Sequence, residues 1–525
     1  MNRILEATTF ANRTAKDLRP SAKPEFNYDG AALSPERRAQ LVQKLRGGAR
    51  YDLVVVGAGV TGSGVALDAA TRGLKVLLLD KEDLAFGTSR WSSKLAHGGL
   101  RYLASGNIGI ARRSAVERGI LMETTAPHLT RALGQVVPVM DEFSTANKVL
   151  PRLGFIAGDA LRIAAKTSGK TLPRSRTISA DRVAELCPAV DREKTKFGYL
   201  NYDGQLFDDA ALVTALARTA GGYGADVLTH CKATAIQGTT IELDLDGSAE
   251  QITVTASAIV NATGVWAGDL DKSVTVTPSR GTHLVIDANK VGNPEGALTV
   301  PVPGATNRFC FILPTQLGRC YIGLTDEPAP LEEEPSAPEE DVEWILNVVN
   351  QALKVKLTSE DVIGKFAGLR PLVQLADSGS KATADLSREH AILVHDRLVT
   401  VTGGKLTEYR LMAEQTVDRV LSEGLLQGIP TGSCVTKSTP LIGAPAQPEQ
   451  SGHTDQTSDL VERADEPVAP GLGVTRGRLS FAVTHEGART VADILDRRTR
   501  IGLVPADRSA AVPAAREVLV AAGLG

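Results

Sequence analysis

The fold is decided by residues 51–80, which read YDLVVVGAGVTGSGVALDAATRGLKVLLLD. A short, β-rich apolar run at residues 52–56 leads into a glycine-rich turn. Apolar residues then recur at helical spacing over residues 60–72, and a second apolar run follows at residues 75–79. Gly73 is placed to end the helix. The pattern predicts a strand–helix–strand unit at the start of an α/β domain.

The turn between the first strand and the helix has the GxGxxG spacing of a dinucleotide site. Gly57 permits the tight turn, Gly59 lets the backbone approach a pyrophosphate, and Gly62 lets the helix pack closely on the sheet. The pyrophosphate would lie at the helix N-terminus, where N–H groups favour an anion. Asp80 ends the second strand, 23 residues after Gly57, and is placed to bond a ribose hydroxyl. The alternative is a glycine-rich turn in an unrelated α/β domain.

Two later segments favour FAD over NAD. Residues 258–266, AIVNATGVW, form a strand that runs into a small-residue turn and resemble the second flavin-binding segment of two-dinucleotide-type flavoproteins. Residues 398–406, LVTVTGGKL, predict a strand, a glycine pair and a helix start, whose dipole can face the flavin edge that becomes negative on reduction. The residues expected to contact FAD in these two segments are Ala262, Thr263, Gly264, Gly403, Gly404, Lys405 and Leu406. No His or Cys lies in a recognisable flavin-attachment motif, so we expect non-covalent FAD.

Composition narrows the class of protein. The chain has 525 residues, too many for one core, with ordinary hydrophobic (42%) and charged (23%) contents. A net charge of -3 gives no case for nucleic-acid binding. The five cysteines form no CxxC pair, which argues against a zinc site and for a reducing compartment; we expect no metal. We expect no membrane-spanning helix, because no apolar run approaches 18 residues. We also expect no secretory signal, because the first residues contain no apolar h-region.

The first 50 residues are basic, with ten Lys or Arg against five Asp or Glu. This composition predicts either a disordered arm or a segment that contacts an anionic membrane surface. Residues 282–286 and 308–323 predict strands, the second as a hairpin. An acidic, proline-bearing loop at residues 331–341 precedes a helix expected at residues 342–353. Residues 443–475 predict a flexible linker, and a last helical segment is expected at about 485–525.

Residues 87–103, GTSRWSSKLAHGGLRYL, resemble the SSKLxHGGLRYL segment of FAD-dependent glycerol-3-phosphate dehydrogenases. Three other stretches resemble further segments of that family: GLRPL at 368–372, GGKLTEYR at 403–410 and IGLTD at 322–326. The likeness runs from about residue 50 to 436. Glu408 departs from the family, which usually has Thr there, and so do Trp91 and the 443–475 linker.

The resemblance implies a D-amino-acid-oxidase-like α/β fold, in which a Rossmann-like FAD-binding domain is interleaved with an antiparallel-sheet substrate domain and followed by a helical C-terminal region. We expect the FAD-binding domain at residues 51–125, 198–275 and 360–425. The substrate domain is expected at 126–197 and 276–359, and the C-terminal region at 426–525.

The resemblance also implies oxidation of sn-glycerol 3-phosphate to dihydroxyacetone phosphate, with hydride transfer from C2 to N5 of FAD. A phosphate dianion needs fixed cations, and arginine suits it best. Arg101 and Arg370 are therefore assigned to the phosphate and the substrate oxygens, the alternative being surface or ion-paired arginines. His283 is the first choice for the base, since the usual pKa of histidine suits a proton acceptor at neutral pH; the alternative is a core histidine. Lys405 is expected at the flavin edge or on the substrate.

The remaining assignments concern supporting residues and partners. Tyr102 and Thr325 are expected at the substrate, the alternative for Thr325 being that it orders the neighbouring turn. Ser92 and Ser93 are expected at FAD, and His97 in support of the loop that carries Arg101. The family implies that electrons pass to a membrane quinone, with the protein held peripherally on the cytoplasmic face of the cell membrane; a homodimer stays open. Three alternatives remain: a glycerol-3-phosphate oxidase that uses dioxygen, an amino-acid or glycine oxidase, and a flavin-binding protein without catalysis.

Overall fold

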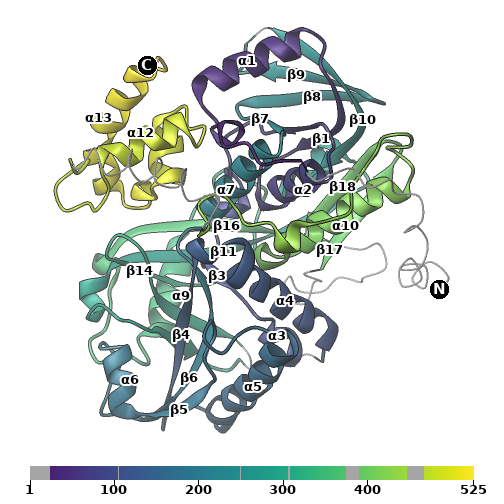
Figure 1. The fold of residues 1–525 in the computed structure, drawn as a ribbon. Helices are drawn as coiled ribbons and strands as arrows, with labels where there is room; N and C mark the ends of the chain where they lie inside the picture. Colours follow the sequence, from purple (N-terminus) through teal and green to yellow (C-terminus); the bar gives the residue numbers. More distant parts are fainter. Residues whose placement is uncertain (1–23, 105, 249, 306–307, 374–388, 446–465) are drawn as a thin grey trace.

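The computed structural model describes residues 24–104, 106–248, 250–305, 308–373, 389–445 and 466–525. Figure 1 shows two sheet-based units, one above the other, with a smaller helical unit from the C-terminal end of the chain beside them. The first sheet, the second sheet and the C-terminal helices form the cores of these three units.

The first sheet carries the predicted strand–helix–strand unit. Its strands run in the order β17 (His390–His395), β18 (Leu398–Gly403), β10 (Gln251–Asn261), β1 (Arg50–Val56), β2 (Val76–Leu79) and β7 (Asp226–Leu228). The hairpin of β8 (Cys231–Gln237) and β9 (Thr240–Leu245) extends it through β10. From β18 to β7 the neighbouring strands are parallel, whereas β17 is antiparallel to β18. The carboxyl ends of the parallel strands therefore share one edge.

Both faces of the first sheet are covered, which explains why its strands are almost continuously apolar. Leu53 and Val55 of β1 face one core, and Val54 and Val56 face the other. The first core is covered by α2 (Val60–Thr71), α7 (Asp209–Gly222) and α10 (Tyr409–Ser422); the second is covered by α1 (Pro35–Arg46) and the β8–β9 hairpin. Gly73, at a φ of 88°, follows α2 as predicted.

The second sheet is mainly antiparallel, as expected for the substrate unit. Its main path runs β15 (Glu327–Pro328), β11 (Val276–Asp287), β14 (Arg319–Gly323), β13 (Phe309–Pro314), β12 (Ala297–Pro301), β4 (Thr130–Met140), β6 (Thr195–Leu206) and β3 (Leu95–Ala96). Off this path, β16 (Val362–Val373) pairs with β11, and β5 (Arg176–Ser179) pairs with β6. The remaining helices here are α3 (Leu100–Ala104), α4 (Ile108–Ile120), α5 (Thr145–Ala164), α6 (Ala180–Leu186) and α9 (Glu339–Val349), and the short α8 (Ala267–Leu270) follows β10.

The structure moves three expected boundaries. Strands β6 and β16 fall inside segments that we assigned to the FAD-binding domain, yet both pair within the second sheet. The helix expected at residues 342–353 begins earlier, at Glu339, because Pro338 precedes it and three acidic residues fill its first turn, where they favour the helix dipole. The basic first 50 residues are folded in their second half, where α1 packs on the sheet; residues 1–23 lie outside the described part.

The C-terminal unit differs from the single helical segment that we expected. It contains α12 (Arg476–Thr484), a π-helical turn at Asp493–Arg498 and α13 (Pro505–Ala521), which pack around one apolar cluster. The expected linker at 443–475 is described only at its ends. At its second end, Pro467 pairs with Thr475 and Val468 is buried, so that part of the segment is packed.

Candidate active site

Three segments far apart in the sequence meet at one edge of the first sheet. Val56 of β1 lies opposite Asn261 of β10, and Asn261 lies opposite Thr400 of β18. The GxGxxG turn, the Ala262–Thr263–Gly264 turn and the Gly403–Gly404 pair each follow one of these strands. This edge is where open α/β sheets bind their ligands. The expectation that the three segments form one site therefore has a geometric basis.

The glycine turn leaves no room for side chains. A Cβ on Gly57, whose φ is 104°, would lie 2.6 Å from the carbonyl oxygen of Ala262, and a Cβ on Gly62 would lie 1.8 Å from that of Gly57. A Cβ on Gly59 would meet only the hydroxyl of Ser89, at 3.1 Å. That hydroxyl accepts a hydrogen bond of 2.9 Å from the N–H of Val60, so an acceptor already lies at the start of α2. The residues present fit the pyrophosphate of FAD.

The carboxylate of Asp80 shapes the glycine turn. It accepts hydrogen bonds from the backbone N–H groups of Ala58, at 2.6 Å, and Glu82, at 2.9 Å. Burial raises the pKa of Asp80 to about 6. The contact with the ribose stays a prediction.

Residues 88–93 connect the two sheets. Thr88 donates to the carbonyl oxygen of Leu369 on β16, at 2.6 Å. Ser92 donates to Asp209, at 2.7 Å, and Ser93 Oγ lies 3.2 Å from Nε2 of His283 on β11. The two serines that we expected at FAD are therefore fixed on a segment that runs from the start of α2 to the second sheet.

Arg370 and Thr325, two residues expected at the substrate, lie in contact. The Arg370 guanidinium lies over Gly281 and donates to the carbonyl oxygen of Thr325, at 3.1 Å, and to Asp326, at 3.2 Å. The Arg370 side chain is 22% exposed. Its contact with Asp326 agrees with the alternative, raised from the sequence, that this arginine is ion-paired. The Thr325 hydroxyl accepts from the N–H of Thr282 and thereby orders the neighbouring turn.

Lys405 and Tyr102 also meet, although α3 and the glycine pair are separated by about 300 residues. Nζ of Lys405 lies 3.7 Å from the centroid of the Tyr102 ring, a cation–π geometry. The same Nζ lies 3.0 Å from Ser114 Oγ and 3.1 Å from Glu408, and Ser114 also bonds Glu408. Glu408, the residue that departs from the family pattern, is thus a buried counter-ion of Lys405.

His283 does not have the ordinary pKa on which its predicted role as the base depends. It is 1% exposed and its ring stacks on Phe366. Burial, followed by the charges of Lys94 and Arg370, lowers the pKa of His283 to about 3. It is neutral at pH 7 and a weak proton acceptor, whereas an effective base has a pKa near the working pH.

His97 has a different environment from His283. It is 53% exposed, and its Nδ1 lies 3.4 Å from the buried carboxylate of Asp203. Asp203 also accepts from the N–H of Gly98 and from Arg118, at 2.6 Å, and so fixes the loop. For Arg101 the backbone lies in α3, but its side chain is outside what the structure describes.

Comparisons with known proteins decide the family. A family model described as DAO, FAD dependent oxidoreductase, matches residues 52–409. Glycerol-3-phosphate dehydrogenase 1 of Mycobacterium tuberculosis (strain ATCC 25618 / H37Rv) is 50% identical over 511 residues, which cover 93% of this chain and 98% of that protein. The chain belongs to the FAD-dependent glycerol-3-phosphate dehydrogenase family.

Solved structures support this placement. The crystal structure of the glycerol-3-phosphate dehydrogenase from Bacillus halodurans, complexed with FAD, is similar with a TM-score of 0.67 and 25% identity, covering 93% of this chain and 94% of that one. The L-alpha-glycerophosphate oxidase from Mycoplasma pneumoniae shares the fold, with a TM-score of 0.55 and 16% identity over 75% of this chain and 99% of that one. The predicted fold class and FAD as the cofactor are confirmed.

Within this glycerol-3-phosphate dehydrogenase fold, sequence reasoning missed the carboxylates that hold the site together. Asp203 fixes the His97 loop, and Asp209 holds Ser92 together with the buried ammonium of Lys94. Asp341, on α9, accepts from Arg280 and Thr282 beside Thr325. Each of these acids lies outside the quoted motifs, at the start of a helix or within a strand. The sequence around each acid therefore gives no indication of its role.

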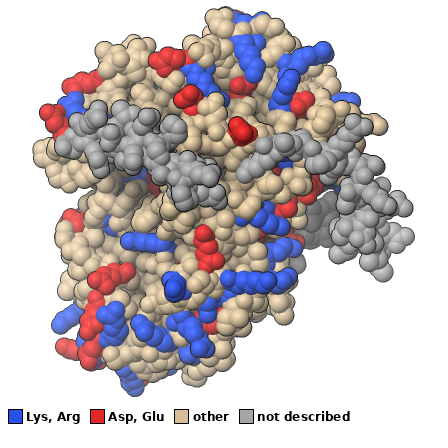
Figure 2. All heavy atoms as spheres, in the orientation of Figure 1, with Lys and Arg blue, Asp and Glu red and all other residues tan. Residues whose placement is uncertain are grey.

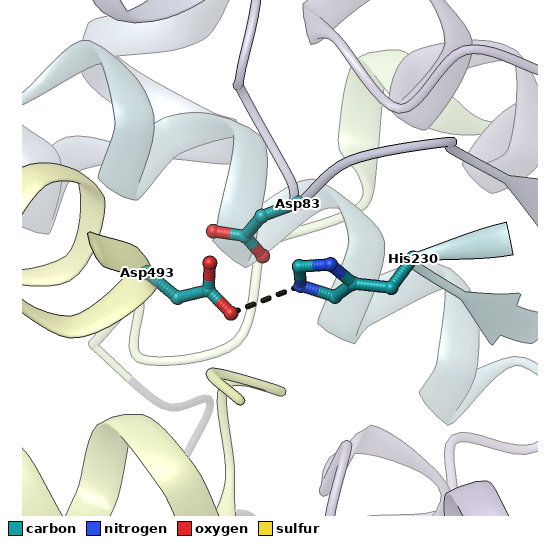
Figure 3. A group of neighbouring side chains, drawn as sticks. All are labelled: Asp83, His230 and Asp493. Carbon is teal, nitrogen blue, oxygen red and sulfur yellow. Dashed lines mark hydrogen bonds and ion pairs between the residues drawn. The ribbon is translucent and has the colours of Figure 1, made fainter. Parts of the chain in front are cut away.

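A second polar cluster lies between the FAD-binding and C-terminal units. Figure 3 shows Asp83, His230 and Asp493 pointing toward one another, with possible ligand atoms all within 4.8 Å. Arginines already occupy the carboxylates: Arg497 and Arg498 donate to Asp83, and Arg497 donates to Asp493. The cluster is an ion-pair network that fastens the C-terminal unit to the glycerol-3-phosphate dehydrogenase body, and we expect no metal there.

This network predicts a pH-dependent stability. Burial lowers the pKa of His230, but the 3.1 Å hydrogen bond to Asp493 and the negative charges of Asp493 and Asp83 together outweigh burial and raise the pKa above its ordinary value. A raised folded-state pKa stabilises the protein below the unfolded pKa, and this contribution disappears as the pH rises through the folded value. Thermal unfolding should therefore show a larger loss of Tm for His230→Gln at about pH 6 than at about pH 8. Equal losses of Tm at the two pH values would contradict a charged His230.

Proposed function

We propose that the chain oxidises sn-glycerol 3-phosphate to dihydroxyacetone phosphate with FAD and delivers the electrons to a membrane quinone. The observation that carries the proposal is the placement of two cations around one sheet edge. Lys405 follows Gly403 and Gly404 at the end of β18. Arg370 lies on β16, whose Val373 would be 3.1 Å from a Cβ on Gly403. Two separated cations suit the phosphate and the hydroxyl oxygens of a small polyol phosphate.

FAD, when bound along the Gly57, Ala262 and Gly403 turns, supplies the acceptor for the hydride that leaves C2. Arg370 and Lys405 would bind the anionic substrate and fix C2 in position. The proton of the C2 hydroxyl must leave together with the hydride, so that the carbon becomes a ketone. We assign that proton to His97, since a carboxylate orients its Nδ1 and leaves Nε2 to accept. His283 then serves to hold Ser93.

The electron acceptor separates a dehydrogenase from an oxidase. The family resemblance favours a quinone, and we first attributed membrane contact to the basic N-terminal residues. Three of those residues now have acidic partners: Arg38 pairs with Asp246, Lys44 with Asp226 and Arg46 with Glu250. We find no helix in the described residues that is long and apolar enough to cross a bilayer. The three ion pairs argue against α1 as a membrane contact.

An anaerobic titration tests the proposed function. Adding glycerol 3-phosphate to the yellow holoenzyme should bleach the flavin absorbance in proportion, whereas glycine or D-alanine should not. Reoxidation should be fast with a soluble quinone analogue and slow in air-saturated buffer. Bleaching by an amino acid would support an amino-acid oxidase, and rapid peroxide formation in air would support a glycerol-3-phosphate oxidase. A flavin that no substrate bleaches would indicate a non-catalytic protein.

The cofactor itself gives a simple prediction. Acid precipitation of purified protein should release all of the FAD into the supernatant, because no His or Cys of the sequence lies in a recognisable flavin-attachment motif. Absorbance at the flavin band in both fractions measures this. Yellow colour that stays with the pellet would contradict a non-covalent link.

A further inference from the structure

Residues 80–94 connect β2 to β3 and run along the expected FAD site. Near the start of this connection, Asp80 shapes the glycine turn, and further along the Ser89 hydroxyl accepts from an N–H at the start of α2. Ser92 and Ser93, which we expect at FAD, lie close to its end. Whatever holds the connection in place therefore also shapes the FAD site.

The C-terminal unit holds this connection with three arginines. They belong to residues 493–500, which read DILDRRTR and contain the π-helical turn. Figure 2 shows many Lys and Arg side chains at the surface, whereas Arg497, Arg498 and Arg500 are at most 5% exposed. Arg497 and Arg498 bind the carboxylate of Asp83, near the start of the connection. Arg500 reaches the other end, which carries the two serines.

The Arg500 guanidinium lies against the backbone of the connection. Its Nη2 donates to the carbonyl oxygen of Arg90, at 2.7 Å, and that oxygen also accepts from Nζ of Lys94, at 3.1 Å. Nε of Arg500 lies 3.7 Å from the carboxylate of Asp208. The next residue, Asp209, accepts from Lys94 and from the first of the two serines. Two buried cations and two buried carboxylates therefore hold this backbone, and one of the cations comes from the C-terminal unit.

The conformation of Arg500 is unfavourable for the C-terminal unit by itself. Its φ of 60° lies in the left-handed region, where a residue with a Cβ is strained. Its Nε is buried and has no hydrogen-bond partner among the described residues, which is also unfavourable. The carbonyl oxygen of Arg500 accepts from Arg319 of β14, at 3.0 Å, while Nη2 binds Arg90. Strain persists where surrounding contacts fix a residue, and here those contacts come from both sheet-based units.

We propose that Arg500 is a positioning residue for FAD. It fixes the carbonyl group of Arg90 and thereby the backbone that presents Ser92 and Ser93, so tight binding of the cofactor depends on the attached C-terminal unit. A loop that is already held in its bound conformation loses less entropy on binding, which raises affinity. This inference goes beyond the proposed function, because it concerns FAD and involves neither the substrate nor the electron acceptor.

Release of FAD from the purified holoenzyme tests the role of Arg500. The test variant is Arg500→Met, and Arg500→Lys keeps the charge and an N–H donor. The matched control is Arg508→Met, which removes another arginine of the C-terminal unit, one that pairs with Asp496. Each protein is diluted in a series, and free FAD is separated by ultrafiltration to obtain the Kd. The visible absorbance spectrum of the bound flavin and the Tm are recorded for each protein.

We expect Arg500→Met to raise the Kd of FAD by about tenfold or more, because a hydrogen bond from a charged donor is lost. The absorbance maxima of the bound flavin should shift, Arg500→Lys should recover most of the affinity, and Arg508→Met should match the wild type. A lower Tm of Arg500→Met with an unchanged Kd and an unchanged spectrum would overturn the proposal, since Arg500 would then only stabilise the fold. An equal rise of the Kd in Arg508→Met would overturn it too.

A second variant decides the question if Arg500→Met does not fold. Asp208 caps the N-terminus of α7 by accepting from the N–H of Ala210, and asparagine caps helices as well as aspartate does. Asp208→Asn therefore keeps the cap and removes the charge that faces Arg500. A rise in the Kd of FAD of about threefold would support the proposal, because hydrogen bonds and contacts to charged groups are the stronger ones. A wild-type Kd would refute it.

Discussion

Arg370→Met should lower kcat/KM for glycerol 3-phosphate by about a hundredfold or more, because losing a charge-assisted contact to a bound anion costs a few kcal/mol and ~1.4 kcal/mol is tenfold. Methionine keeps the length of the side chain and removes the guanidinium, which lies beside Thr325 and Asp326. Steady-state kinetics with a soluble acceptor measure the effect. The FAD content should not change, since Arg370 lies on β16 of the second sheet.

A matched control is Arg192→Met, which removes an exposed arginine that pairs with Asp181 in the same unit. It should leave kcat/KM unchanged. Arg370→Lys should recover part of the activity if charge matters and little of it if the planar fork is required. Near-wild-type turnover in Arg370→Met would place the substrate site elsewhere.

Asp83→Asn should destabilise the protein by about 3–5 kcal/mol, the cost of leaving a buried charge without its partner. Asp83 is fully buried and accepts from Arg497 and from two nitrogens of Arg498, at 2.7–2.8 Å. Asparagine has the same shape but no charge, so Arg498 would lose the carboxylate that it contacts and Arg497 would keep only Asp493. Because the network links the C-terminal unit to the rest of the protein, the C-terminal unit should detach first. Limited proteolysis followed by mass measurement should detect this detachment together with the fall in Tm.

Asp181→Asn provides the control, since it breaks an exposed pair with Arg192 and should cost less than about 1 kcal/mol. A loss that small for Asp83→Asn would mean that the apolar contacts of Leu503 and Val504 with Phe366 hold the C-terminal unit without the network.

Local patterns predicted the local parts of this fold well. The GxGxxG unit is recognisable because its strand, turn and helix are adjacent in sequence and each glycine has a steric reason. The motifs that predicted Lys405 and Tyr102 also identified two side chains that meet in space. Long-range pairing was not predictable: nothing within residues 362–373 shows that β16 pairs with β11 of the other sheet. The roles assigned to the site residues stay predictions.

His283 shows the limit for the site. Its ordinary pKa in the sequence becomes about 3 because the fold buries the ring beside Lys94 and Arg370, and neither neighbour is close in sequence.

The order of the strands in the first sheet has a consequence for biosynthesis. The flavin edge needs β1, β10 and β18, so the last of its glycines, Gly404, leaves the ribosome after more than three quarters of the chain. A nascent or prematurely terminated polypeptide that lacks β18 and α10 would leave one side of β10 and the core beneath α2 open. Cofactor loading should therefore be a late event in the life of each molecule, and fragments from aborted translation should be colourless substrates for proteolysis.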